Sequence, residues 1–202
     1  MKRFILPALA LVLLLLVLQG CVSSPAKRYY QLAVMVNDTG RTVPQIGKIL
    51  IVQNVEVDRV YDDYRVVYRL SPYELNYYAY QFWAKNPGEM LRDAMVDYLS
   101  KCGSFEKVIT KFLEGTPELM LKAEVSKMEE VDRVDAWFAQ LDMTITVSSL
   151  KTGEKVLVHQ FKRRKKLTEK KVEKLPIGIS IILEEELEKV INQLALKINE
   201  TK

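Results

Sequence analysis

Strict alternation of apolar and polar residues over the segment 137–149 is the feature that most limits how this chain can fold. In an extended strand, every second side chain points to the same face of the sheet. Alternation of this kind is typical of a half-buried antiparallel strand. A turn at Thr152-Gly153-Glu154 follows, and residues 156–161 then supply a partner strand, which predicts a hairpin with one covered face. The apolar set of the segment 137–149 is Trp137, Ala139, Leu141, Met143, Ile145 and Val147.

Two segments are predicted to form helices that cover a sheet. The first begins after Asn86, which suits the N-cap, has Pro87 at its first helical position, and ends at Gly103. The second runs from Pro176 to about Ile198. Each carries a single apolar stripe, as expected of a helix that packs on one side. The stripes consist of Leu91, Ala94, Met95, Tyr98, Leu99 and Cys102 in the first helix, and Leu183, Leu187, Val190, Ile191, Leu194 and Ile198 in the second.

Other apolar stretches are predicted as strands. Residues 48–57 (KILIVQNVEV) are apolar on both faces in their first half, as in a strand inside a sheet that is covered on both sides. Residues 64–70 alternate and lead into an aromatic run that ends at Phe82, which predicts a second hairpin. The chain is therefore expected to be α/β, with a mixed, largely antiparallel sheet and two main helices packed on it, in a single domain over residues 29–202. Further strands are predicted at 29–36, 105–113 and 119–131.

The first 20 residues have the pattern of an export signal. Lys2 and Arg3 precede fifteen largely apolar residues, too few for a spanning helix of about 20 residues. The sequence Leu18-Gln19-Gly20-Cys21 follows and resembles the bacterial lipobox. In that class of signal the cysteine thiol receives a diacylglycerol, the signal is cut before the cysteine, and the new amine is acylated. Residues 1–20 are therefore predicted as a lipoprotein signal peptide.

Cys21 is predicted as a lipid attachment point, and the alternative is a disulfide with Cys102, the other cysteine of the chain. Two or three acyl chains hold a protein on a membrane essentially permanently, whereas one binds marginally. Residues 21–28 contain serines and a proline without periodicity, which predicts a lipidated tether with a reach of about 20 Å. The folded body must then lie close to its membrane, and Cys102 is expected to be a small buried side chain.

Composition and motifs narrow the possible functions. The 202 residues carry a net charge of +4, and loss of residues 1–20 leaves 28 basic and 26 acidic residues, or +2, which does not indicate nucleic-acid binding. The phosphate-loop spacing fails at Gly47-Lys48, and neither a nucleophile elbow nor a His-Glu-x-x-His motif occurs. The single histidine, His159, lies in a predicted strand. The pairs Glu129-Glu130 and Asp62-Asp63 are explained by solvation. We predict no catalytic residue, no metal and no cofactor.

Aromatic residues gather in the hairpin predicted between residues 64 and 83. Seven of the ten tyrosines lie between Tyr61 and Tyr80. Aromatic side chains favour strands, so sheet packing explains part of this cluster. Tyrosine and tryptophan also anchor protein interfaces, so contact with a partner protein or another subunit is the second explanation. The candidate contact residues are Tyr73, Tyr77, Tyr78, Tyr80, Phe82 and Trp83.

One run of positive charge stands out near the C-terminal third. Its simplest explanation is a solvated strand end and loop. The functional alternative is attraction to anionic lipid headgroups, at about 1 kcal/mol for each charge close to the surface. The candidate membrane-surface residues are Lys162, Arg163, Arg164, Lys165 and Lys166.

Taken with these elements, the sequence resembles the ABC-type transport auxiliary lipoproteins, the PqiC-like components of MCE-type lipid transport systems. The matching features are the lipobox with Tyr29-Tyr30-Gln31-Leu32 after it, the strand KILIVQNVEV, and a closing helix that ends LALKI. The most specific one is the segment VVYRLSPYELNYYAYQFWAKNPGEMLRDAMVDYL, in which an aromatic hairpin leads through Trp83-Ala84 into a helix headed by proline.

The resemblance implies a sandwich similar to the N-terminal domain of TolB-like periplasmic proteins. It also implies a lipoprotein beside a permease, an ATPase and an MCE-family substrate-binding protein, moving phospholipid or another hydrophobic solute across the envelope, without catalytic residues of its own. Val22 is not the aspartate of an inner-membrane retention signal, so the periplasmic face of the outer membrane is favoured. The expected role is to dock the MCE protein at the membrane, and a ring of copies of this chain is one form that such a docking subunit can take. The alternatives are a lipid carrier or receptor and a general envelope-assembly lipoprotein.

Overall fold

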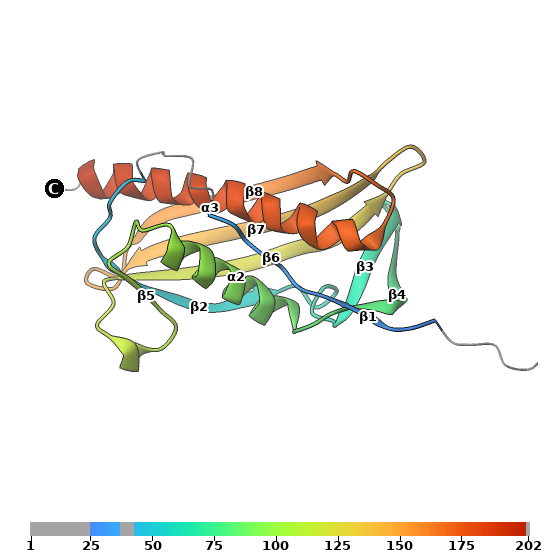
Figure 1. Cartoon of the computed structure of the whole chain (residues 1–202). Helices are drawn as coiled ribbons and strands as arrows, with labels where there is room; N and C mark the ends of the chain where they lie inside the picture. The colour runs from blue at the N-terminus through green and yellow to red at the C-terminus, as the bar shows by residue number, and fades with distance from the viewer. Residues whose placement is uncertain (1–24, 37–42, 201–202) are drawn as a thin grey trace, which may run out of the picture.

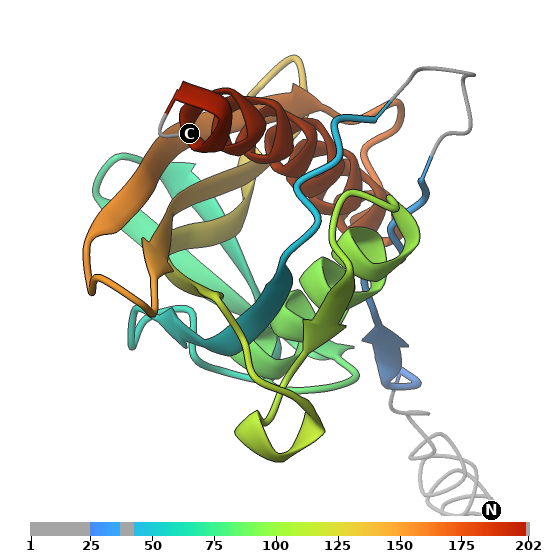
Figure 2. The ribbon, with the colours of Figure 1, turned by 90° about the vertical axis from the view of Figure 1, so that its left-hand side faces the viewer.

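A computed structural model describes residues 25–36 and 43–200, so the predicted signal peptide and Cys21 lie outside the described residues. Two α-helices lie on one side of a curved eight-stranded sheet (Figures 1 and 2). The helices are α2 (Pro87–Lys101) and α3 (Leu175–Glu200), with two short 3-10 helices, η2 (Phe112–Glu114) and η3 (Val172–Lys174). The strands are β1 (Arg28–Tyr30), β2 (Ile49–Val57), β3 (Arg65–Ser71), β4 (Glu74–Trp83), β5 (Lys107–Ile109), β6 (Leu119–Asp132), β7 (Trp137–Ser149) and β8 (Lys155–Lys166).

The sheet forks at β6. On one side of β6 lie β7 and then β8, both antiparallel to their neighbours. On the other side, β2 pairs with the first half of β6 and β3 with its end, both in parallel. The β2 branch ends at β5, and the β3 branch continues through β4 to β1. The predicted mixed sheet with two helices is confirmed, and the antiparallel pairings are its longest ones.

The segments predicted as strands and helices from their apolar patterns supply the buried core. Strand β7 begins and ends at the predicted residues, and its apolar set faces α3. Asn86 caps α2 by accepting a hydrogen bond from the Gly88 amide at 2.9 Å, and Gly103 has a φ of 74°, the left-handed conformation that ends helices. In β2, residues 50–52 are completely buried, which confirms a strand covered on both faces.

Two strand predictions are wrong in length. The strand expected at 29–36 is reduced to β1, because the backbone amides of Ala33 and Met35 donate to side chains of α3, Ser180 and Glu184, in place of a neighbouring strand. The strand expected at 105–113 is reduced to β5, after which the chain turns into η2. Strand β8, by contrast, continues five residues beyond the predicted end at 161 and contains the whole basic run.

No helix within residues 25–36 and 43–200 has the length and apolar character that a membrane crossing requires.

Candidate functional site

The aromatic residues of the β3–β4 hairpin divide between the interior and the surface. Trp83 is 2% exposed and belongs to the core. The hydroxyl groups of Tyr77 and Tyr78 are used inside the fold, donating to the carbonyl of Val60 at 2.9 Å and to the carboxylate of Glu130 at 2.8 Å. Tyr73, in the turn between the strands, is 99% exposed. Of these four, only Tyr73 has its whole ring exposed.

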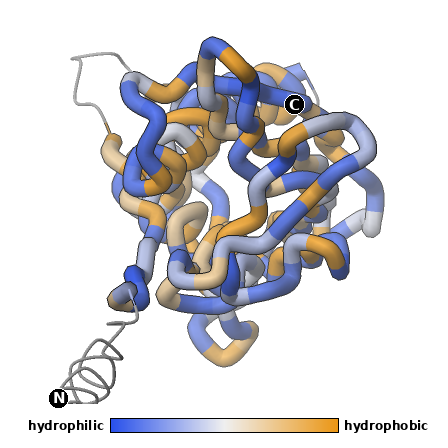
Figure 3. The backbone as a smooth tube through the Cα atoms, turned by 90° about the vertical axis from the view of Figure 1, so that its right-hand side faces the viewer, coloured by the Kyte–Doolittle hydropathy of each residue, from blue (hydrophilic) through white to orange (hydrophobic). Residues whose placement is uncertain are grey.

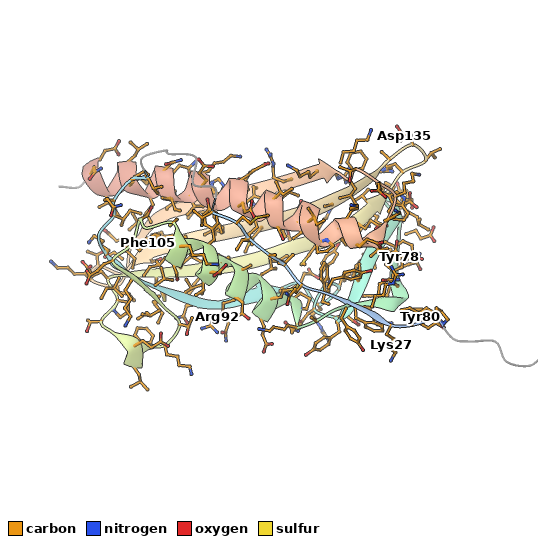
Figure 4. The ribbon with its side chains drawn as sticks, in the orientation of Figure 1. Lys27, Tyr78, Tyr80, Arg92, Phe105 and Asp135 are labelled. Atoms are coloured by element: carbon orange, nitrogen blue, oxygen red, sulfur yellow. The ribbon has the colours of Figure 1, made fainter. Side chains whose placement is uncertain are left out.

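The last two aromatic candidates lie at the β1 edge, where the chain enters the domain. Phe82 stacks on Tyr29 with ring centroids 5.7 Å apart, and the Lys27 ammonium lies 5.5 Å from the Phe82 centroid. Tyr80 is 39% exposed and lies beside Lys27 at the lower right of Figure 4. Lys27, Tyr29, Tyr80 and Phe82 form an amphipathic surface next to the tether, which we call the tether edge.

Two completely buried glutamates lie where β3 joins β6, although the sequence pattern assigned this pair to solvation. Glu129 is neutralised by Arg69, whose Nε donates to its Oε1 at 2.7 Å, and the Tyr61 hydroxyl donates to its Oε2 at 2.8 Å. This environment raises the pKa of the Arg69 guanidinium further, so the pair stays charged. This buried ion pair links β3 to β6 and so holds the β3–β4 hairpin in position against β6.

Glu130 faces the opposite side of β6, and no cation in the described part of the chain pairs with it. Its Oε1 accepts the Tyr78 hydroxyl, while its Oε2 has no hydrogen-bond partner among the described residues. Burial raises the pKa of this carboxyl to about 7, against the smaller, opposing effect of the Tyr78 hydrogen bond, and nearby Asp132 raises it further. Glu130 is therefore an acid that can change its protonation state near neutral pH while it touches the hairpin.

Replacement of Glu130 by glutamine should make the domain more stable at pH 8 and change it little at pH 4. Because the folded pKa of about 7 lies above the ordinary 4.5, the folded protein binds more protons than the unfolded chain between these values, and stability falls as the pH rises through them. The shift corresponds to about 3 kcal/mol. Urea unfolding at both pH values checks this, with exposed Glu124→Gln on the same strand as the control. Equal pH slopes in Glu130→Gln and the parent protein would contradict it.

The basic run is divided by the alternation of β8. Arg163 and Lys165 point toward α3, where both bind the carboxylate of Glu185, at 2.8 and 2.9 Å. Three cations point to the outer face of the sheet, which neither α2 nor α3 covers (Figure 1). There, Arg164 donates from Nε to the Gln140 side-chain oxygen at 2.6 Å. The other two outward cations are Lys162 and Lys166.

The outer face has a depression at this position. Its volume is about 650 Å³, it is open, and the residues that line it are all polar or charged. Asp142 on its floor is 3% exposed and lies between Lys127 of β6 and Lys162 of β8 in the strand register. Its lining is Ser126, Lys127, Gln140, Asp142, Lys162 and Arg164. With three cations and one carboxylate, this surface is suited to a partner that carries negative charge.

The hairpin turn and the basic strand end at the same end of the molecule. Strands β3 and β6 are parallel, so the turns that follow them, with Tyr73 and Val134, lie at one end of the sheet. The end of β8 lies there too, because Lys166 is opposite Phe138 at the start of β7 (Figure 1). Val134 is 100% exposed. In the sequence, it differs from its surroundings only as an apolar residue within a charged turn. We call Tyr73, Val134, Lys162, Arg164 and Lys166 the tip surface.

The tether edge and the basic strand lie on opposite edges of the sheet. Five neighbouring pairs separate β1 from β8, in the order β1, β4, β3, β6, β7, β8, and strands lie about 4.8 Å apart. Figure 1 shows β1 along the lower side and β8 along the upper side. The membrane contact expected of the basic run stays a prediction: α3 binds two of its five cations, and the other three lie on β8, at the sheet edge opposite β1.

The two remaining residues with reactive side chains, His159 and Cys102, have structural contacts inside the domain. His159 Nε2 lies 2.7 Å from Glu186 of α3, which also binds Lys189, and Cys102 is buried with its Sγ 3.2 Å from the Leu99 carbonyl. Within the part of the chain that the structure describes, no group of three or more His, Cys, Asp or Glu side chains is placed to hold a metal ion.

Solved structures share this fold. A crystal structure of a Xanthomonas campestris protein of the family DUF330 matches with a TM-score of 0.73 and 18% identity, over 86% of this chain and 98% of that one. The crystal structure of an uncharacterised protein matches with a TM-score of 0.64 and 18% identity, over 86% and 99%. At these identities the likeness concerns the fold alone. No curated protein sequence matches this chain significantly.

A family model matches the folded domain. The model describes the ABC-type transport auxiliary lipoprotein component and matches residues 30–190, which is most of the chain and nearly all of the described domain. The match includes both helices up to Val190, the aromatic hairpin and the whole of β8. The chain therefore belongs to the family of ABC-type transport auxiliary lipoprotein components.

Proposed function

We propose that this chain is the non-enzymatic docking subunit of an MCE-type ABC transporter that moves phospholipid or another hydrophobic solute across the envelope. Acyl chains on Cys21 hold it on the membrane with the domain in the periplasm, and the outer membrane is favoured because Val22 follows the cysteine. The tip surface binds an MCE-family substrate-binding protein, which connects it to the permease and ATPase. Membership of the auxiliary lipoprotein family is the observation that supports this most strongly.

The separation of the tether edge from the tip surface also supports a docking role. A docking subunit needs one region that stays at the membrane and another that reaches a partner. The tether enters at β1, and the tip surface includes the last residues of β8, at the other edge of the sheet. Tyr73 and Val134 supply exposed apolar contact, and the three outward cations supply charge that selects an acidic partner.

A lipid carrier is less well supported, because buried side chains occupy the space between the sheet and the two helices. Leu99, Leu141 and Leu183 come from α2, β7 and α3 and are at most 1% exposed. Two open pockets that described residues form lie outside this space. One is the depression on the outer face, and the other lies at the opposite end, beside Lys155 and the last turns of α3. Polar and charged residues line the depression, which does not suit an acyl chain, whereas Leu119, Val156 and Ile198 contribute to the lining of the second pocket.

Substitutions in the tip surface test the docking role. We expect Tyr73→Ala to lower the affinity for the MCE protein about tenfold, because a central interface tyrosine contributes about 1 to 2 kcal/mol. Lys162→Glu together with Arg164→Glu should reduce association and its dependence on salt. The readout is the amount of MCE protein, permease and ATPase recovered with the full-length lipoprotein from detergent-solubilised membranes.

Matched controls come from the opposite ends of the same strands. Tyr64 precedes β3 and is 55% exposed, and Lys155 opens β8. Tyr64→Ala and Lys155→Glu should leave recovery of the transporter unchanged. Equal losses in the tip and control variants would contradict the tip surface, whereas no recovery with the parent protein would contradict the docking role itself.

A further inference from the structure

Two adjacent apolar side chains protrude from the connection between β5 and β6. Phe112 is 60% exposed and Leu113 is 99% exposed, and both lie in η2. This connection is the lowest part of the tube in Figure 3, where it includes a hydrophobic segment. Single exposed apolar residues are ordinary, but two neighbours at the end of a projection present a contact surface.

Hydrogen bonds hold this projection in shape. The Lys107 ammonium donates to the Glu114 carbonyl at 2.6 Å, and the Thr110 hydroxyl donates to the Glu114 carboxylate at 3.2 Å. At its base, the Arg92 guanidinium of α2 donates to the Thr110 carbonyl at 3.0 Å. Because polar groups form the frame, Phe112 and Leu113 are held outward.

The projection lies on the same side of the molecule as the tether. Strands β5 and β1 end the two branches on one side of β6, while β7 and β8 lie on its other side. In the two perpendicular views of Figures 1 and 2, the connection after β5 and the described residues next to β1 are both at the lower side. A flat surface below the molecule in these views would meet both.

The tether edge carries residues typical of a membrane interface. Tyr29 is 63% exposed and stacks on Phe82, with Lys27 over the same ring, and Tyr80 is 39% exposed. Aromatic rings with a polar end, accompanied by lysine, are enriched at the level of lipid headgroups. The lower side therefore has two amphipathic contact points, one at each end.

We infer that Phe112 and Leu113 insert into the headgroup region of the lipid leaflet that holds the anchor. This rests on the proposed lipid at Cys21, and the length of the tether supplies the geometric argument. Four residue steps separate Cys21 from Pro25, the first described residue, and they span at most about 14 Å. The tether keeps the β1 end of the lower side within this distance of the bilayer, and the projection meets the bilayer when the lower side faces it. A lipid surface is therefore the occupant that is always present at this distance.

Probes at two equally exposed positions test the insertion. Leu113 is 99% exposed, and Val134 in the tip surface is 100% exposed and directly precedes Asp135, which is labelled at the upper right of Figure 4. Full-length Leu113→Cys and Val134→Cys lipoproteins are labelled with an environment-sensitive fluorophore and placed in phosphatidylethanolamine and phosphatidylglycerol vesicles. Cys102 is buried, and the unsubstituted protein gives the background. The probe at 113 should shift to shorter wavelength and be quenched by spin-labelled lipids, and the probe at 134 should do neither.

The outcomes separate the insertion from the anchor. If the protein floats with the vesicles and the probe at 113 behaves like the probe at 134, the insertion is refuted and the anchor stands. If the protein does not float with the vesicles, both fail. Phe112→Ser with Leu113→Ser provides a second measurement. It should leave flotation intact. An aqueous quencher should then quench a fluorophore attached at Tyr29→Cys more strongly, because the domain can tilt away from the bilayer. Unchanged quenching of this fluorophore would also contradict the insertion.

Discussion

Arg69→Ala should lower the free energy of unfolding by about 3 to 5 kcal/mol, the range for removal of one partner from a buried ion pair. Glu129 is completely buried and its carboxylate relies on Arg69 for its countercharge, so the substitution leaves a negative charge in a place that water does not reach. The Tyr61 hydroxyl alone cannot replace that charge. Urea unfolding followed by circular dichroism measures the loss.

Two further variants show whether the buried charge is the cause. Arg69→Met combined with Glu129→Leu removes both charges and should recover most of the lost stability, because apolar side chains of similar size often replace a buried ion pair at little cost. Lys85→Ala removes an ion pair with Asp93 in which both side chains are more than half exposed, and it should leave stability unchanged. A double variant as unstable as Arg69→Ala would contradict the explanation.

Cys21→Ala should remove the protein from the membrane fraction. Without the thiol no diacylglycerol can be added, so we expect the protein in the soluble periplasmic fraction or as an uncleaved precursor that still carries residues 1–20. The expected effect is nearly complete, because two or three acyl chains bind a bilayer essentially permanently and none of that binding remains. Fractionation with immunoblotting, together with the mass of the mature N-terminus, measures it.

Cys102→Ala is the matched control for the anchor. Cys102 is buried against α2 and is expected to remain a core side chain, so this variant should stay in the membrane fraction with its N-terminus processed. A mature Cys21→Ala protein that remains bound to the membrane would contradict the anchor. A parent protein whose N-terminus carries no lipid and whose Cys102 is oxidised would instead favour the disulfide alternative.

The elements with strong local signals were predictable. Alternation located β7 at its observed ends, because one face of that strand is covered by α3 and the other is polar. Asn86, Pro87 and Gly103 located α2 for a similar reason, since caps and stops act within a few residues of the chain. The β3–β4 hairpin followed from alternation and a short turn.

Features that depend on partners distant in sequence were not predictable. The amides of Ala33 and Met35 bind α3 side chains nearly 150 positions later, and no local pattern shows that they leave the strand. Burial of Glu129 and Glu130 depends on β3 joining the end of β6. The candidate surfaces depended on the same kind of information: alternation divides the basic run, but only the position of Glu185 shows which cations are paired with α3.

Native mass spectrometry of the full-length lipoprotein, isolated from its own membranes in mild detergent, tests the docking role most directly. The account predicts a complex with an MCE-family protein, a permease and an ATPase, in which this chain carries no lipid beyond the acyl groups on Cys21. A transporter-free protein that holds one additional lipid per chain would contradict the account and identify a carrier.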